Sequence, residues 1–325
     1  MLTAFLSLAL ALPLTAGDPL RRERLPADVD FVMHLDFEGF KTTRLYQMVL
    51  EHEELEADFD ELGEIEERFG LDPLRDLRAV TLFKVEEEEE PTVVLLSTST
   101  KVDAALEKLQ KQRGYRRINE DRIELHTWKE EGHDDESVYG YLHGSGEERV
   151  VVLASNRASA LRAARVLRGE QPSLAKNDTG LKVAPAEGSF LYLAASDLSR
   201  MDEFAPASQV FGLAQGLQFD VGEAGGFLRA HVGVSTRNAD DAFELANVVN
   251  GFVSLARLAG REAGEALELL TGLKVQSRGA SLTLDFEYEL ERLVELLRTL
   301  DGGDEKEPER VEPVDRSENE KVRRR

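Results

Sequence analysis

The feature that most constrains the fold of this chain is a sequence pattern that occurs twice. An alternating apolar run ending in Ser99-Thr100 leads into Asp103-Ala104-Ala105, and a second run, Gly233 to Thr236, leads into Asp241-Ala242-Phe243. In both places a strand-like period of two gives way to helical spacing, with hydroxyl residues where a helix start needs a cap. Self-similarity on this scale indicates two copies of one domain-sized unit.

Each unit is predicted to follow the order β-α-β-β-α-β with an additional strand or helix at its end. This order is that of the ferredoxin-like split βαβ arrangement, an α+β fold whose antiparallel sheet carries helices on one face. We expect the first module at residues 25–169, a Pro- and Gly-rich linker at 170–188 and the second module at 189–300. The last 25 residues, 301–325, contain 16 charged ones and are predicted to be a disordered tail.

The first predicted strand holds the candidate site residues. Phe31, Met33, Leu35 and Phe37 alternate with more polar positions, so they predict the buried face. His34 and Asp36 then share the other face, with Glu38 two positions on, and this face is predicted to lie in solvent. The alternative is that His34, Asp36 and Glu38 hold a divalent cation or form an acid/base pair.

The charge balance excludes some partners and the absence of cysteine excludes some chemistries. With 63 acidic and 40 basic residues the formal charge is −23, which repels nucleic acid and anionic membranes. The sequence has no cysteine, so disulfides, thiol catalysis and cysteine-bound metals are excluded. Intact nucleophile-elbow and phosphate-loop motifs are also missing, and we predict no cofactor and no nucleic acid partner.

The first 17 residues predict export. Met1 to Gly17 carries no charged side chain, and small residues, including Thr15 and Gly17, precede the polar Asp18. This pattern is typical of a signal peptide that is cleaved before Asp18, with cleavage after Ala16 as the alternative. The apolar run is shorter than the ~20 residues that span a bilayer, and no later segment is long enough to do so.

Two further segments carry a resemblance to other proteins. The opening Pro26-Ala27-Asp28-Val29-Asp30-Phe31 and the later Phe69-Gly70-Leu71-Asp72-Pro73 resemble a loose group of exported bacterial two-module proteins. The resemblance covers the first third of the chain, and its motifs are structural turns. It implies a bacterial source and a periplasmic or extracellular location, and it carries no activity.

Together these features predict an exported binding or scaffolding protein of the bacterial cell envelope, with an envelope or extracellular protein or a small ligand as its partner. Two alternatives remain open. One is a metal-dependent or acid/base hydrolase that uses His34, Asp36 and Glu38. The other is a structural envelope protein tethered by its charged tail, in which Lys321 to Arg325 form a basic tip.

Overall fold

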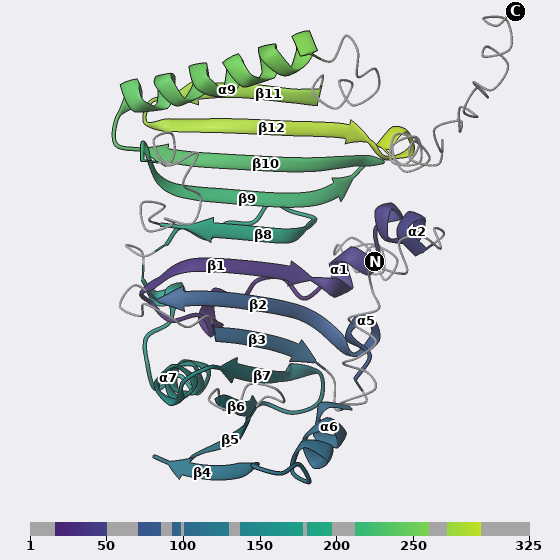
Figure 1. Cartoon of the computed structure of the whole chain (residues 1–325), viewed down its shortest axis with the longest axis vertical. Helices are drawn as coiled ribbons and strands as arrows, with labels where there is room; N and C mark the ends of the chain where they lie inside the picture. Colours follow the sequence, from purple (N-terminus) through teal and green to yellow (C-terminus); the bar gives the residue numbers. More distant parts are fainter. Residues whose placement is uncertain are drawn as a thin grey trace, which may run out of the picture.

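The computed structural model describes residues 17–50, 71–85, 93–98, 101–129, 137–177, 181–196, 212–259 and 272–293. The predicted signal peptide, apart from Gly17, and the predicted tail at 301–325 lie outside these residues. Within them, twelve strands join into one sheet, and all of the pairings are antiparallel (Figure 1). The α+β class and the antiparallel sheet that the sequence predicts are therefore confirmed.

The described part of the chain contains strands, α-helices and short 3-10 turns. The strands are β1 (Val29–Asp36), β2 (Leu77–Val85), β3 (Val93–Thr98), β4 (Arg116–Glu120), β5 (Ile123–Lys129), β6 (Ser137–His143), β7 (Arg149–Ala154), β8 (Ser189–Ala195), β9 (Ala214–Ala224), β10 (Phe227–Thr236), β11 (Leu273–Arg278) and β12 (Ser281–Glu289). The α-helices are α1 (Phe37–Lys41), α2 (Arg44–Leu50), α5 (Pro73–Asp76), α6 (Lys101–Leu109), α7 (Arg157–Leu167) and α9 (Ala239–Ala259), and short 3-10 turns lie at η1 (Arg22–Arg24), η3 (Gly146–Glu148) and η4 (Leu174–Lys176).

The strand order across the sheet is β11-β12-β10-β9-β8-β1-β2-β3-β7-β6-β5-β4. Strands β1, β2 and β3 follow one another as an antiparallel meander, so the parallel neighbours of a split βαβ unit do not form in this half. The two halves of the sequence meet where β1 pairs with β8, with Phe31 opposite Ala195 and Val32 opposite Ala194. The sheet is thus continuous from one half to the other.

The two halves bury opposite faces of this sheet. In the first half, α7 packs Ala160 and Ala164 against the face that carries Val32, Phe83 and Val152. In the second half, α9 packs on the other face. The core beneath α9 consists of Ala195, Ala214, Val234, Leu245, Ala246 and Leu282, with Phe31, Leu217, Val232, Val249, Val275 and Leu284 packed against them. Because side chains alternate along a strand, adjacent residues of β1 and β8 enter different cores.

The predicted linker at 170–188 packs onto the first core. Leu174 is fully buried and Val183 nearly so, and Pro26 forms an isolated bridge with Ser173. The charged lead before β1 is packed in the same way, since Leu25 is fully buried. Both segments pack on the same sheet face as α7 and contribute to the first core.

Helix caps differ from the expected ones. The first predicted pair of capping residues, Ser99 and Thr100, lies outside the described residues. Helix α7 is capped by Asn156, whose side chain accepts from Ser159 N at 2.8 Å. At α9, Asn238 Oδ1 accepts from Asp241 N at 2.9 Å. Thr236, which belongs to the second copy of the repeated pattern, is the last residue of β10 and does not cap α9. Asn is as good a cap as Ser, so sequence spacing alone left the choice ambiguous.

Helix α9 buries a narrower stripe than its sequence predicts. Leu245 and Ala246 face the sheet, whereas Phe243, Phe252 and Leu255 are 60%, 67% and 63% exposed. A helix that packs on one sheet face can bury only one side of its surface.

Candidate functional site

The second half of the sheet leaves one face without a described helix, opposite the face covered by α9. We call this surface the polar face. Its side chains are Gln218 and Asp220 on β9; Arg229, His231 and Ser235 on β10; Ser281, Thr283, Asp285 and Glu287 on β12; and Lys274 and Gln276 on β11. Antiparallel sheets commonly present such a face to water, so its polarity alone does not define a site.

A groove distinguishes the polar face from an ordinary solvated surface. Its floor is formed by β9, β10 and β12, and its wall by the loop before β1 and the segment that follows η4; it encloses about 690 Å³. The wall belongs to the layer that covers the first half of the sheet, so the groove lies in the corner where the two halves meet. Its volume is within the range of small-molecule sites.

The groove is lined by neutral hydrogen-bonding groups more than by charges. The floor and wall carry the amides and hydroxyls of Asn177, Ser196, Gln215, Gln218, Ser235, Ser281 and Thr283. Gln218 is fixed in place, because its Nε2 donates to Lys182 O at 2.6 Å. The Asp and Lys residues of the lining are Asp28, which pairs with Arg162, Asp30 and Lys182.

A second hollow of about 310 Å³ lies further along the polar face. Here the His231 ring Nδ1 lies 2.7 Å from Asp285 Oδ1, and Arg229 pairs with Glu287 at 3.1 Å. These groups are roughly half exposed and paired across neighbouring strands. Such cross-strand pairs stabilise a sheet modestly and do not by themselves indicate a reaction.

Of the three residues that the sequence grouped as a candidate site, the structure keeps His34 and Asp36 together beneath Asp18 and sets Glu38 apart. His34 and Asp36 are each only 5% exposed, so the predicted solvent face of β1 is a buried one. Glu38 lies on α1 and pairs with Lys41 at 2.8 Å. The prediction that His34 and Asp36 lie in solvent was wrong because the segment at Asp18 covers both residues. The alternation of residues along a strand does not show whether another segment packs on its polar face.

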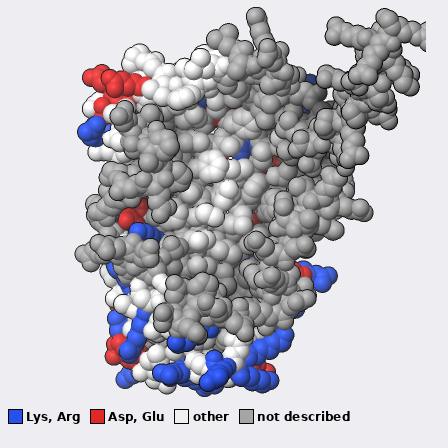
Figure 2. Space-filling model, viewed as in Figure 1, with Lys and Arg blue, Asp and Glu red and all other residues white. Residues whose placement is uncertain are grey.

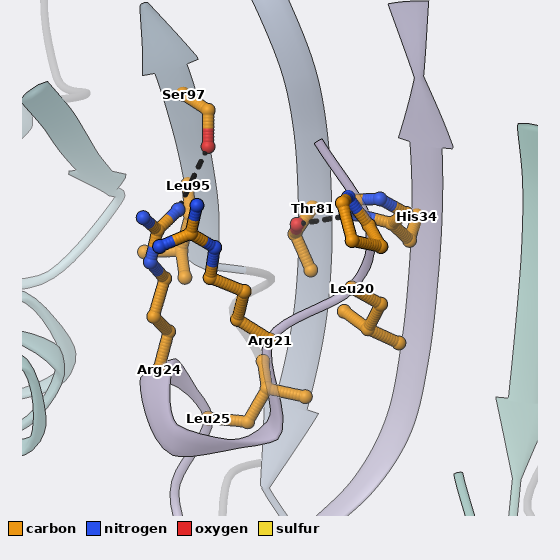
Figure 3. A pocket seen from close by; sticks show the side chains of 9 residues that line it. Leu20, Arg21, Arg24, Leu25, His34, Thr81, Leu95 and Ser97 are labelled. Carbon is orange, nitrogen blue, oxygen red and sulfur yellow. Dashed lines mark hydrogen bonds between the residues drawn. The ribbon is translucent and has the colours of Figure 1, made fainter. Parts of the chain in front are cut away.

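His34 is held by two hydrogen bonds in a small enclosed pocket (Figure 3). Its Nε2 lies 3.0 Å from Asp18 O and its Nδ1 lies 2.9 Å from Thr81 Oγ1. A carbonyl oxygen only accepts, so Nε2 carries the proton and Nδ1 accepts from the threonine hydroxyl. Burial lowers the pKa of His34, against a smaller raising effect of the neighbouring Asp36, and the neutral ring fits this network.

The pocket beside His34 leaves about 10 Å³ for the centre of a water-sized sphere, the room of a single water. Figure 3 shows Arg24 directed to Ser97, whose Oγ accepts at 2.9 Å, with Leu20 and Leu25 closing the other side. A substrate has no space here. Among the described residues, His34, Asp36 and Glu38 included, no group of three metal-ligating side chains is close enough to hold an ion.

Positive charge gathers at one end of this acidic chain. Figure 2 shows Lys and Arg side chains at the lower end, where Figure 1 places α6 and β4. The exposed cations from the start of α6 to the end of β4 are Lys101, Lys108, Lys111, Arg113, Arg116 and Arg117. Since β4 is the last strand of the sheet, its charges discourage another chain from pairing with that edge.

Comparison with known proteins finds likeness at the level of structure. No family model matches the chain, and no curated protein matches it. Among solved structures, the chain is similar to crystal form III of TP0453, with a TM-score of 0.45 and 11% identity, covering 87% of this chain and 99% of that one. Crystal form IV of TP0453 matches with a TM-score of 0.45 and 12% identity, covering 86% of this chain and 96% of that one. Similarity at this level assigns no function.

No helix in the described part of the chain is long and apolar enough to cross a membrane. From the sequence we expect a partner to meet an exposed sheet face or the groove between the modules, but the sequence did not indicate which residues line the groove. Its lining residues are separated by up to about 250 positions and carry no motif, and the only signal was the run of small polar residues on the alternate positions of β10 and β12.

Proposed function

We propose that this chain is an exported protein of the bacterial cell envelope that binds a small, neutral, polar ligand in the groove of the polar face. The groove carries the proposal, because it pairs a volume of about 690 Å³ with amide and hydroxyl groups on both floor and wall. Such groups donate to and accept from hydroxyls and amides, so a saccharide is the ligand class that fits. The uncharged first 17 residues support export.

The glycine at the centre of the groove floor allows a direct test. A Cβ at Gly233 would lie 3.5 Å from His231 Nε2 and 3.8 Å from Gln218 Cβ, which is ordinary van der Waals contact. Gly233→Phe is therefore expected to fill the groove without displacing the backbone. Gly251→Phe on α9, where an added Cβ meets nothing within 4 Å, is the matched control.

Ligand-observed NMR with neutral mono- and oligosaccharides at millimolar concentration measures binding. We expect the unmodified chain and Gly251→Phe to bind, and Gly233→Phe to lose binding with an unchanged urea midpoint. Saccharide binding that survives Gly233→Phe would place the ligand elsewhere, and an absence of binding across the series would refute the ligand class.

A further inference from the structure

Asp18, in the segment that precedes β1, is buried and held by hydrogen bonds of its backbone. Its N–H donates to Asp36 Oδ1 at 2.9 Å, and its carbonyl accepts from His34. The residue is 4% exposed, and its carboxylate lies 3.5 Å from nitrogens of both Arg21 and Arg78. Residues near a chain end are usually the least restrained, so this degree of fixation calls for a reason.

Asp36, the acceptor of the Asp18 N–H, is a buried carboxylate held by neutral donors. Its Oδ1 accepts from Asp18 N and also from Gly39 N at 2.8 Å. Within the described residues no Lys or Arg forms an ion pair with Asp36. A buried carboxylate is most strongly stabilised when a cation is among its hydrogen-bond donors.

Two glycines pack closely against the second oxygen of Asp36, where a larger residue would not fit. A Cβ at Gly17 would lie 2.4 Å from Asp36 Oδ2, and a Cβ at Gly39 would lie 2.7 Å from the same atom. No other residue fits at position 17 without moving the carboxylate. Gly17 is also the small residue at which the predicted signal peptide ends.

We propose that the Gly17–Asp18 bond is a processing site, and that the fold contains the receptor for the N-terminus that processing creates. Hydrolysis by a signal peptidase adds one water across the amide, leaving a carboxylate on Gly17 and an α-ammonium on Asp18. The nitrogen already lies 2.9 Å from Asp36 Oδ1, so the ammonium forms a buried ion pair where the precursor has a neutral hydrogen bond. Loss of Gly17 also frees the space beside Oδ2 for a second ammonium proton.

This inference rests on the proposed export and adds a consequence for stability. A hydrogen bond to a charged donor is worth roughly 1 kcal/mol more than a neutral one, which corresponds to about a fivefold larger folding equilibrium constant. The mature chain should therefore be more stable than the same chain with its N-terminus blocked.

The effect has a defined pH dependence. An α-amino group has an unfolded pKa of about 7.7–8.0, and the ion pair raises it in the folded state. The gain is thus fully present below about pH 7.7 and is lost as pH rises through the folded value. The other charged or titratable groups facing the nitrogen are the carboxylates of Asp36 and Asp18, the guanidinium groups of Arg21 and Arg78, and His34, whose pKa is lowered by burial.

A four-chain cycle tests the pair. Chains of residues 18–325 are prepared from a fusion whose removal leaves Asp18 first, with the amine either free or acetylated, and each with Asp36 or with Asp36→Asn. Asn keeps the Oδ1 acceptor and removes the charge. Urea unfolding is measured at pH 7 and at pH 10.

With Asp36 present, the free-amine chain should have an approximately fivefold larger folding constant at pH 7, a difference that shrinks at pH 10 and vanishes with Asp36→Asn. Equal stability of free and acetylated chains at pH 7 would overturn the ion pair. If Asp36→Asn does not fold, the test of the ion pair rests on whether the stability difference between the free-amine and acetylated Asp36 chains shrinks from pH 7 to pH 10.

The site of processing is measured separately, by N-terminal sequencing of the full-length chain secreted from a bacterial host. Asp18 as the first residue supports the proposal. A chain that is not secreted refutes export and leaves the thermodynamic cycle informative, whereas a secreted chain with another first residue refutes this processing site and leaves export standing.

Discussion

Replacing His34 by Ala tests the conclusion that this histidine is structural and not catalytic. The ring is 5% exposed and forms hydrogen bonds to Thr81 and to the carbonyl of Asp18. Removing it leaves a cavity that costs about 2–3 kcal/mol. The carbonyl of Asp18 loses its donor in the interior, which costs about 1–2 kcal/mol more.

We therefore expect His34→Ala to lower the free energy of unfolding by about 4 kcal/mol at pH 7.5, the sum of these two costs. Urea unfolding followed by circular dichroism gives the value. His231→Ala is the control, because the side chain of His231 is 39% exposed and its pairing with Asp285 contributes about 1 kcal/mol at most. A loss below about 1 kcal/mol at His34 would refute the buried network.

The same variant carries a pH signature. Burial lowers the pKa of His34, so the unfolded chain binds a proton that the folded chain does not. Stability from this site is fully present above about pH 6.5 and is lost as pH falls from there toward the folded pKa. The difference between wild type and His34→Ala should shrink over this acid range. Burial also lowers the pKa of His126 and His143, so the variant keeps part of the acid dependence.

Three other substitutions probe separate parts of the fold. Gly222→Ala should destabilise the β8–β9 pairing by about 2 kcal/mol in urea unfolding, since the added Cβ would lie 2.6 Å from Gly188 O, a backbone atom that has little freedom to move. Replacing Arg116 and Arg117 together by Thr should leave stability unchanged and produce concentration-dependent association in light scattering, because the β4 edge loses its two arginines. A monomer at every concentration would contradict the role of these arginines in protecting the edge. Phe252→Ser should change stability by no more than about 0.5 kcal/mol, as the ring is 67% exposed, and a larger loss would show that it packs against something.

The local patterns in the sequence predicted the strands well. The alternation at Phe31 to Phe37 predicts a strand that the structure places at Val29–Asp36, with Phe37 starting α1. The pattern did not identify the buried face, because β1 is an inner strand with neighbours on both sides. Val32, His34 and Asp36 proved the more buried set, and two of them are polar because Asp18 supplies their hydrogen bonds from 16 and 18 positions away.

The residues that line the groove could not be predicted from the sequence, because the groove depends on the register between strands that lie more than 150 positions apart. Pairing of Phe31 with Ala195 and of Val32 with Ala194 sends one pair into the core of α9 and the other into the core of α7. A slip of one residue in this pairing would turn every side chain of β8 to the opposite face. Both helix layers would then cover one face, and the corner that forms the groove would be lost. The proposed binding site is thus a consequence of which residue of β8 stands opposite Phe31.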